Sequence, residues 1–231
     1  MTLTTHQLKQ QEVINRIASQ VNNKNLNFST VLPVDDFAND SRTCLTSVHL
    51  PHQGLLDQVQ QDFIEPLRKI EPDFYYYPSD CLHMTIKNIR VINDPPHFNE
   101  EDVQKAEKMF AESIPQHRMF YVYFYRLLLF PNNLALIGTT DKELDSIVLD
   151  LENKLTAEEI PDDKVYTNSQ YFFSNMTLVR LSGPPSDTFK QKVAELSESL
   201  IIEPYRVDSV TLLTCNAVLK NRQIRGAWKL K

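Results

Sequence analysis

The sequence predicts an α+β fold, in which antiparallel strand pairs alternate with amphipathic helices. Stretches rich in β-branched and aromatic residues alternate with stretches whose apolar residues recur at helical intervals. Neighbouring predicted strands are joined by short turns, as at "PNN" (131–133), and such hairpins favour antiparallel pairing over a doubly wound parallel sheet. The chain has only four glycines, and none forms a G-x-G-x-x-G or P-loop motif.

Composition limits the kinds of ligand and the cellular setting. A chain of 231 residues with 42% hydrophobic residues is long enough for one large domain or two fused lobes. The formal charge of −6 provides no global basic field for long duplex nucleic acid, so an anionic ligand must be bound by a local pocket. Three cysteines without metal-ligand spacing are expected to be reduced thiols. We expect a cytoplasmic monomer with no membrane contact, because no apolar stretch has the length of a membrane helix.

The first half of the chain is expected to place an N-terminal helix and linker (1–41) before a single domain (42–231). Within 1–41, helical spacing of apolar residues predicts a helix over 5–22, which the following Asn-rich stretch ends. Asn99 or the acids after it would cap the second helix of the domain. The elements expected next are a strand at 42–50, a helix at 53–71, a strand at 82–91 and a helix at 100–113.

The second half repeats this rhythm of strands and helices. Asp141 is expected to open the helix that follows the "PNN" hairpin. The expected elements are strands at 118–130 and 134–140, the helix after Asp141, a strand at 171–181, a helix at 187–201, and strands at 206–216 and 223–230.

A short motif occurs twice, as "HMTI" and as "NMTL" about ninety residues later, each in a predicted strand. Because side chains alternate between the two faces of a strand, His83, Thr85 and Lys87 are expected on one face and their apolar neighbours on the other. Asn175 and Thr177 share the corresponding face in the second copy. Two similar lobes packed about a pseudo-twofold axis would bring these polar faces together in one cleft.

The paired motifs resemble those of the two-histidine (2H) phosphoesterase superfamily, which includes 2′,5′-RNA ligase-like and cyclic nucleotide phosphodiesterase proteins. The resemblance covers about residues 42–230. It implies a bilobal fold with two antiparallel sheets around a central groove, flanking helices and a pseudo-twofold repeat. It also implies that His83 and Thr85 occupy the first catalytic and phosphate-binding positions and that Thr177 supplies the second hydroxyl. Asn175 stands where the family has its second histidine.

The chemistry of phosphodiester cleavage explains why asparagine at position 175, in place of a histidine, matters. Phosphodiester cleavage needs one group to accept a proton from the attacking oxygen and another to donate one to the leaving oxygen, and imidazole does either near neutral pH. Asn175 can donate a hydrogen bond to a phosphate oxygen but cannot exchange a proton, and losing one acid or base costs about 10²–10⁴ in rate. His49 and His52, at the end of the first predicted strand, are alternative proton carriers. The scheme requires no metal and no cofactor.

Further binding candidates surround the motif. Lys87 would either bind phosphate or reach solvent, and Tyr76 in "FYYY" would either stack on a nucleobase or flank a strand. The basic C-terminal segment is either a solvated strand pair with Trp228 in the core or a source of a phosphate-binding cation. The candidates in that segment are Lys220, Arg222 and Arg225, with Arg222 preferred.

Three interpretations remain open at this stage. The first is a 2H-type phosphodiesterase that acts on a cyclic or 2′,5′-linked nucleotide or an RNA end, with His83 as the acid or base and with activity reduced by Asn175. The second is a non-catalytic module that binds a nucleotide, an RNA end or a protein on the same fold. The third is a structural α+β protein in which the repeated motif is a coincidence.

Overall fold

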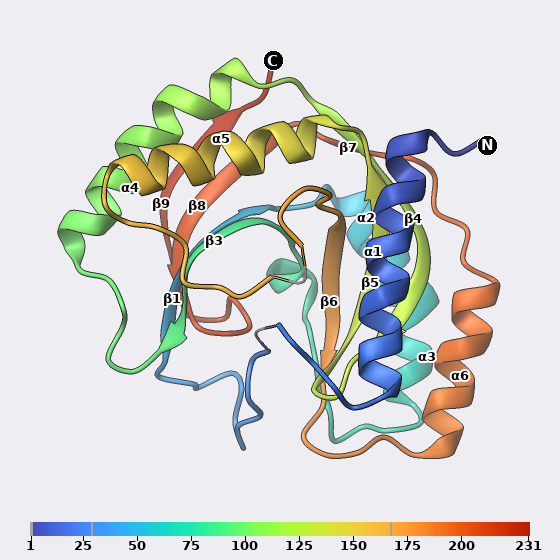
Figure 1. The fold of residues 1–231 in the computed structure, drawn as a ribbon. Helices are drawn as coiled ribbons and strands as arrows, with labels where there is room; N and C mark the ends of the chain where they lie inside the picture. The colour runs from blue at the N-terminus through green and yellow to red at the C-terminus, as the bar shows by residue number, and fades with distance from the viewer. Residues whose placement is uncertain (1, 29, 167) are drawn as a thin grey trace.

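The computed structural model describes residues 2–28, 30–166 and 168–231, which form two antiparallel sheets with helices around them (Figure 1). This arrangement confirms the α+β prediction and the two separate sheets. The first sheet, in the order β3-β1-β8-β9, contains β1 (Thr43–His49), β3 (Met84–Asn93), β8 (Ser209–Cys215) and β9 (Arg222–Lys229). The second sheet, in the order β2-β6-β5-β4-β7, contains β2 (Tyr75–Tyr76), β4 (Phe120–Leu129), β5 (Asn133–Thr140), β6 (Ser174–Arg180) and β7 (Tyr205–Val207).

The helices lie close to the predicted ranges. They are α1 (Thr5–Asn22), α2 (Gln53–Val59), α3 (Glu65–Arg68), α4 (Glu100–Ser113), α5 (Glu143–Ala157) and α6 (Asp187–Glu198). The helix expected at 53–71 is divided, because a π-helical turn (Gln60–Ile64) separates α2 from α3. Pro66 explains the division, since proline lacks the N–H that a regular α-helix requires and clashes with the preceding turn. None of the described helices is long and apolar enough to cross a membrane.

Two predicted boundaries are wrong for identifiable reasons. The strand expected at 206–216 is interrupted at Asp208, and its two parts, β7 and β8, pair in different sheets. Asp141 does not open α5, because its carboxylate accepts a hydrogen bond from the Tyr121 backbone N–H at 2.8 Å and α5 begins at Glu143. The predicted cap of α4 is confirmed, since the Asn99 side chain accepts hydrogen bonds from two backbone N–H groups of the first turn.

Each motif strand has one face in the main hydrophobic core and a second, polar face outside it. Leu82, Met84 and Ile86 are buried in this core, as are Met176 and Leu178 of the second copy. Thr85, Asn175 and Thr177 are half-buried and lie outside it. The alternation of apolar and polar faces that the sequence predicted is therefore present in both copies.

Helix α1 packs onto the second sheet. Its residues Val13, Ile14 and Ile17 form a separate cluster with Ala135 and Ile137 of β5. The buried amide of Gln10 also joins α1 to the sheet: its nitrogen donates to Thr140 Oγ1 at 2.8 Å, and its oxygen accepts from the Thr140 backbone N–H at 2.8 Å. The N-terminal helix is thus part of the packed structure (Figure 1).

The face that α1 covers is the one that carries the second motif. In the register of β5 and β6, Ile137 pairs with Asn175 and Ala135 pairs with Thr177. Cross-strand partners point to the same side of a sheet. Asn175 and Thr177 therefore share the face of the second sheet on which α1 lies.

Candidate functional site

His83 lies immediately before β3, after the 3-10 turn Ser79–Cys81, and is nine-tenths buried. Its Nδ1 lies 2.8 Å from the Cys81 carbonyl oxygen. Because a carbonyl can only accept, Nδ1 carries the hydrogen and Nε2 keeps its lone pair. The pKa of His83 is lowered to about 4, chiefly by burial; the positive charges of Arg180 and Arg222 act in the same direction, and the hydrogen bond to the Cys81 carbonyl acts against it. At neutral pH, His83 is therefore in the form that accepts a proton.

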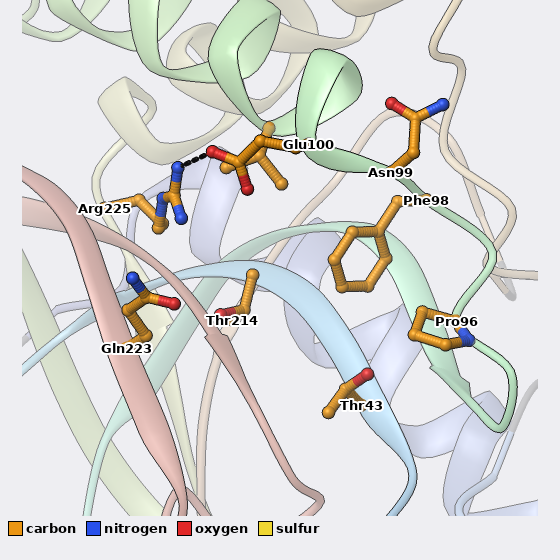
Figure 2. A pocket seen from close by; sticks show the side chains of 9 residues that line it. Thr43, Pro96, Phe98, Asn99, Glu100, Thr214, Gln223 and Arg225 are labelled. Carbon is orange, nitrogen blue, oxygen red and sulfur yellow. Dashed lines mark hydrogen bonds and ion pairs between the residues drawn. The ribbon is translucent and has the colours of Figure 1, made fainter.

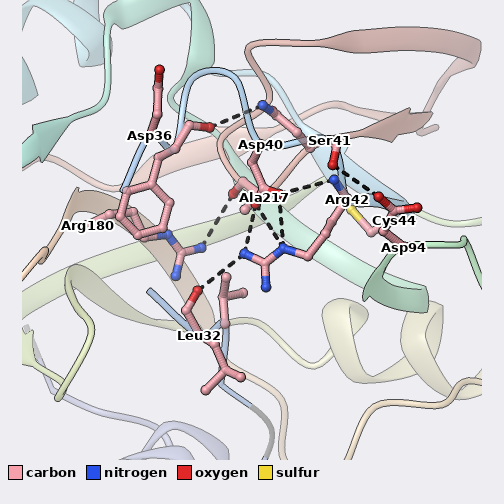
Figure 3. A network of polar contacts seen from close by, with 12 residues as sticks. Leu32, Asp36, Asp40, Ser41, Arg42, Cys44, Asp94, Arg180 and Ala217 are labelled. Atoms are coloured by element: carbon pink, nitrogen blue, oxygen red, sulfur yellow. Dashed lines mark hydrogen bonds and ion pairs between the residues drawn. The ribbon is translucent and has the colours of Figure 1, made fainter. Parts of the chain in front are cut away.

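Arg180, at the end of β6, is a buried cation beside His83. Its Nε donates to the Tyr77 hydroxyl at 3.2 Å and its Nη2 to the Ala217 carbonyl at 3.5 Å. No carboxylate of the described residues pairs with it, whereas the neighbouring Arg42 binds the Asp40 carboxylate at 2.8 Å (Figure 3). A buried guanidinium without a counter-ion favours an anionic ligand.

Sequence reasoning missed Arg180, although it lies only two positions after the second motif copy, NMTL (175–178). Asn133 of β5 pairs with Arg180 and Ala135 pairs with Thr177, with a register shift between Leu134 and Ala135. This shift places Arg180 on the same face as Thr177 even though Arg180 is three positions further along the strand. Strict alternation would have placed the two on opposite faces, so sequence spacing alone gave no signal for Arg180.

Among the three basic candidates of the C-terminal segment, Arg222 lies beside His83. Its Nη1 donates to the Leu219 carbonyl at 2.8 Å and lies 3.6 Å from the Cys81 sulfur. Lys220 is exposed, and Arg225 binds Glu100 and Glu107 of α4. We use the term His83 site for His83, Arg180, Arg222 and Tyr77.

The other two predicted binding residues have partners inside the protein. The Lys87 ammonium is buried and pairs with Glu152 and, at 2.7 Å, with Asp162. The Tyr76 hydroxyl donates to the Glu71 carbonyl at 2.7 Å. The tyrosine of the His83 site is Tyr77, whose ring centroid lies 6.0 Å from that of the His83 ring.

The two motif strands belong to different sheets but approach each other, with Cα atoms of β3 and β6 within 8 Å. Thr177 Oγ1 accepts a hydrogen bond from Asn133 Nδ2 at 3.5 Å. Within the described part of the chain, the Asn175 side chain forms no hydrogen bond, so its amide is available to a ligand. Arg180 is the last residue of β6, and its positive charge contributes to the lowered pKa of His83.

The histidines that were considered as alternative proton carriers lie together elsewhere. His49 is buried, with Nδ1 2.9 Å from the Ser209 carbonyl and Nε2 3.0 Å from the Tyr205 hydroxyl, and burial lowers its pKa. The side chain of His52 is exposed and lies 3.9 Å from the Asp208 carboxylate. Neither is part of the His83 site.

A pocket of about 230 Å³ lies between strands β1, β8 and β9 and the start of α4 (Figure 2). Thr43, Thr214 and Gln223 line it from the strands, and Phe98 lines it from the other side. Its cation, Arg225, is paired with Glu100, so the pocket provides no free positive charge. Among the described residues, no group of three or more His, Cys, Asp or Glu side chains is placed to hold a metal ion.

The fold is similar to that of known structures, although comparisons of the sequence with family models and curated proteins find no match. The apo structure of Escherichia coli LigT matches with a TM-score of 0.54 at 14% identity, covering 83% of this chain and 99% of that chain. This chain has a LigT-like fold.

Further matches agree with this LigT-like fold. LigT complexed with 3′-AMP matches with a TM-score of 0.52 at 14% identity, over 83% of this chain and 99% of that chain. A conserved protein of unknown function from Agrobacterium tumefaciens matches with a TM-score of 0.54 at 15% identity, over 90% of this chain and 95% of that chain. At these identities the similarity establishes the fold alone.

Proposed function

We propose that this protein binds a phosphoryl group of a nucleotide or RNA end at the His83 site and cleaves a 2′,3′-cyclic or 2′,5′-linked phosphodiester there. The main support is a neutral, buried imidazole with two guanidinium groups in electrostatic range and no carboxylate bound to Arg180 among the described residues. A phosphate between these cations would restore charge balance. LigT has the same fold and is known in complexes with phosphate and 3′-AMP, which agrees with this ligand class.

In the proposed reaction, His83 is the general base. Its Nε2 lone pair accepts a proton from the attacking oxygen while Arg180 and Arg222 stabilise the charge on the phosphoryl oxygens. The hydroxyl groups of Thr85 and Thr177 would donate hydrogen bonds to the same oxygens. The phosphate charge also raises the pKa of His83, which helps the imidazole to hold the proton it has accepted.

A second candidate function is nucleotide or RNA-end binding without turnover. The observation that favours it is Asn175, whose amide replaces the second imidazole of the family motif and cannot donate a proton to the leaving oxygen. Such a protein would retain the cations of the His83 site and therefore its affinity for phosphate.

The test measures conversion of 2′,3′-cyclic AMP and of a 2′,5′-linked adenylate dinucleotide to their products, together with thermal stabilisation by 3′-AMP. We expect His83→Asn to lower turnover by at least about 100-fold, since it removes the general base. Arg180→Met should weaken the stabilisation by 3′-AMP, because it removes the buried cation. Asn175→His should raise turnover by supplying the missing acid. His52→Asn, at an exposed position, is the matched control for loss of a histidine.

The outcomes separate the two candidates. Turnover that depends on His83 establishes the enzyme. Stabilisation by 3′-AMP that depends on Arg180, without turnover, establishes the binding module. If neither turnover nor stabilisation changes in the His83 and Arg180 variants, both candidates are refuted.

A further inference from the structure

Two cysteine side chains meet on the first sheet. Cys44 of β1 and Cys215 of β8 are direct cross-strand partners, and their sulfur atoms lie 3.4 Å apart. Opposite residues of an antiparallel pair have Cα atoms about 4.5–5.5 Å apart, within the range of about 4.4–6.8 Å that disulfides span. A disulfide between these two residues therefore requires the sulfur atoms to approach each other, with the pairing of the two strands unchanged.

The two thiols differ in exposure. Cys44 is half-buried, whereas only 1% of Cys215 is exposed. The hydrogen bond with Cys44 and burial both raise the pKa of the Cys215 thiol. Cys215 therefore keeps its proton, and Cys44 is the sulfur that an oxidant from solvent reaches first. A half-exposed cysteine beside a second thiol is the arrangement in which a sulfenic acid is converted to a disulfide.

The turn after Cys215 holds two residues of the His83 site. The Tyr77 hydroxyl donates a hydrogen bond to the Ala217 carbonyl at 3.0 Å. Arg180 Nη2 donates to the same carbonyl at 3.5 Å (Figure 3). Only one residue separates Ala217 from Cys215 in the chain, so a displacement of Cys215 is transmitted to this carbonyl.

Arg222, the second cation of the His83 site, depends on the same turn. It is the partner of Cys215 in the register of β8 and β9, so both side chains point to the same side of the first sheet. Its Nη1 donates to the Leu219 carbonyl within the turn at 2.8 Å. One short stretch, residues 215–222, thus joins the cysteine pair to the contacts that hold both guanidinium groups.

A bond between the two sulfur atoms would move Cys215 and the turn that follows it. The distance between the sulfur atoms must fall from 3.4 Å to about 2.05 Å. Cys215 lies in the close-packed core, where a displacement is passed on to its neighbours. The hydrogen bond from Arg180 to the Ala217 carbonyl is long, at 3.5 Å, so a shift of the turn breaks it and releases the Arg180 guanidinium from its position.

We propose that Cys44 and Cys215 form a reversible disulfide and that its closure weakens phosphate binding at the His83 site; the second part rests on the proposed function. The oxidant is hydrogen peroxide. The Cys44 sulfur attacks one peroxide oxygen, the O–O bond breaks, and a sulfenic acid and water form. The Cys215 sulfur then bonds to the Cys44 sulfur, the S–O bond breaks, and the departing oxygen leaves as water with the Cys215 proton. The two thiols lose two electrons, which reduce the peroxide to water, and an external dithiol reverses the reaction.

The first experiment treats the full-length protein with hydrogen peroxide or with dithiothreitol and identifies disulfide-linked peptides by mass spectrometry. We expect one linkage after peroxide treatment, between Cys44 and Cys215, with the remaining cysteine, Cys81, left as a free thiol. Cys44→Ser and Cys215→Ser should each remove the linkage, and Cys81→Ser should retain it. Thermal unfolding of each reduced variant reports whether it is folded.

The second experiment measures the Kd of 3′-AMP by titration calorimetry for the reduced and the oxidised wild type. We expect the Kd to rise by at least about tenfold on oxidation, because the phosphate loses a charged hydrogen-bond donor. Dithiothreitol should restore the affinity. Cys44→Ser, treated with peroxide in the same way, is the matched control and should keep its affinity. A loss of affinity in this variant would show that peroxide acts at another residue and would overturn the effect of the disulfide.

The results separate this inference from the proposed function. A folded, peroxide-treated protein without the linkage, or with a linkage to Cys81 instead, overturns the disulfide. A linkage between Cys44 and Cys215 with an unchanged Kd of 3′-AMP overturns its effect on the His83 site. If the reduced wild type does not bind 3′-AMP, phosphate binding at the His83 site is refuted together with this effect, whereas the disulfide is still decided by mass spectrometry.

Discussion

The burial of His83 predicts a pH dependence of folding stability. The pKa of His83 is lowered from 6.5 to about 4, chiefly by burial. Because the unfolded chain binds this proton more tightly than the folded protein, the free energy of unfolding rises with pH between about 4 and 6.5 and is constant above that window. The pKa difference corresponds to about 3 kcal/mol over the whole window, and about 2 kcal/mol of this is lost at pH 5.

The perturbation that isolates this effect is His83→Asn. The asparagine amide nitrogen occupies a position similar to Nδ1, so it can still donate to the Cys81 carbonyl, but it does not titrate. Urea unfolding of both proteins between about pH 4 and pH 8 measures the free energy difference at each pH. We expect the variant to gain about 2 kcal/mol relative to the wild type when the pH falls from 7 to 5.

The free energies of unfolding of the wild type and of His83→Asn must be subtracted at each pH, because a second group, Asp145, changes the stability of both proteins in the opposite direction. Burial raises the pKa of Asp145 to about 6, so its contribution to stability is lost as the pH rises through the same region. This contribution is common to both proteins and cancels when they are subtracted. A stability difference that stays constant across the pH range would show that His83 is not buried in its neutral form and would refute the reasoning.

Two further predictions concern packing and charge. Ile14→Ala should lower the free energy of unfolding by about 2–5 kcal/mol, because Ile14 is fully buried between α1 and β5. Leu8→Ala, at an exposed position of α1, is the control. An equally small loss of stability in both variants would show that α1 is not packed against the sheet. Lys87→Met should cost about 3–5 kcal/mol in urea unfolding, because the buried Asp162 carboxylate loses its ion pair. If Lys87→Met costs no more than Lys69→Met, the control at an exposed lysine, the ion pair does not stabilise the fold.

Local sequence patterns were sufficient to predict most of the helices and strands. The helix at 100–113 was predicted with its bounds and its Asn99 cap, because apolar spacing and capping act within a few residues of one another. The apolar faces of both motif strands were predicted for the same reason. The strand expected at 206–216 was not resolved into its two parts, because pairing with two sheets depends on chain segments far away in the sequence.

The amino-acid sequence alone determined the α+β plan, the two motif strands and the absence of an imidazole at Asn175, since periodicity and residue identity are local properties. Only the tertiary structure decided which cations lie beside His83. Arg180 reaches that position through a register shift in β6, and Lys87 is instead paired with Asp162. Each of these depends on the distance between residues remote in sequence, because charge pairing and burial arise only when the chain is folded.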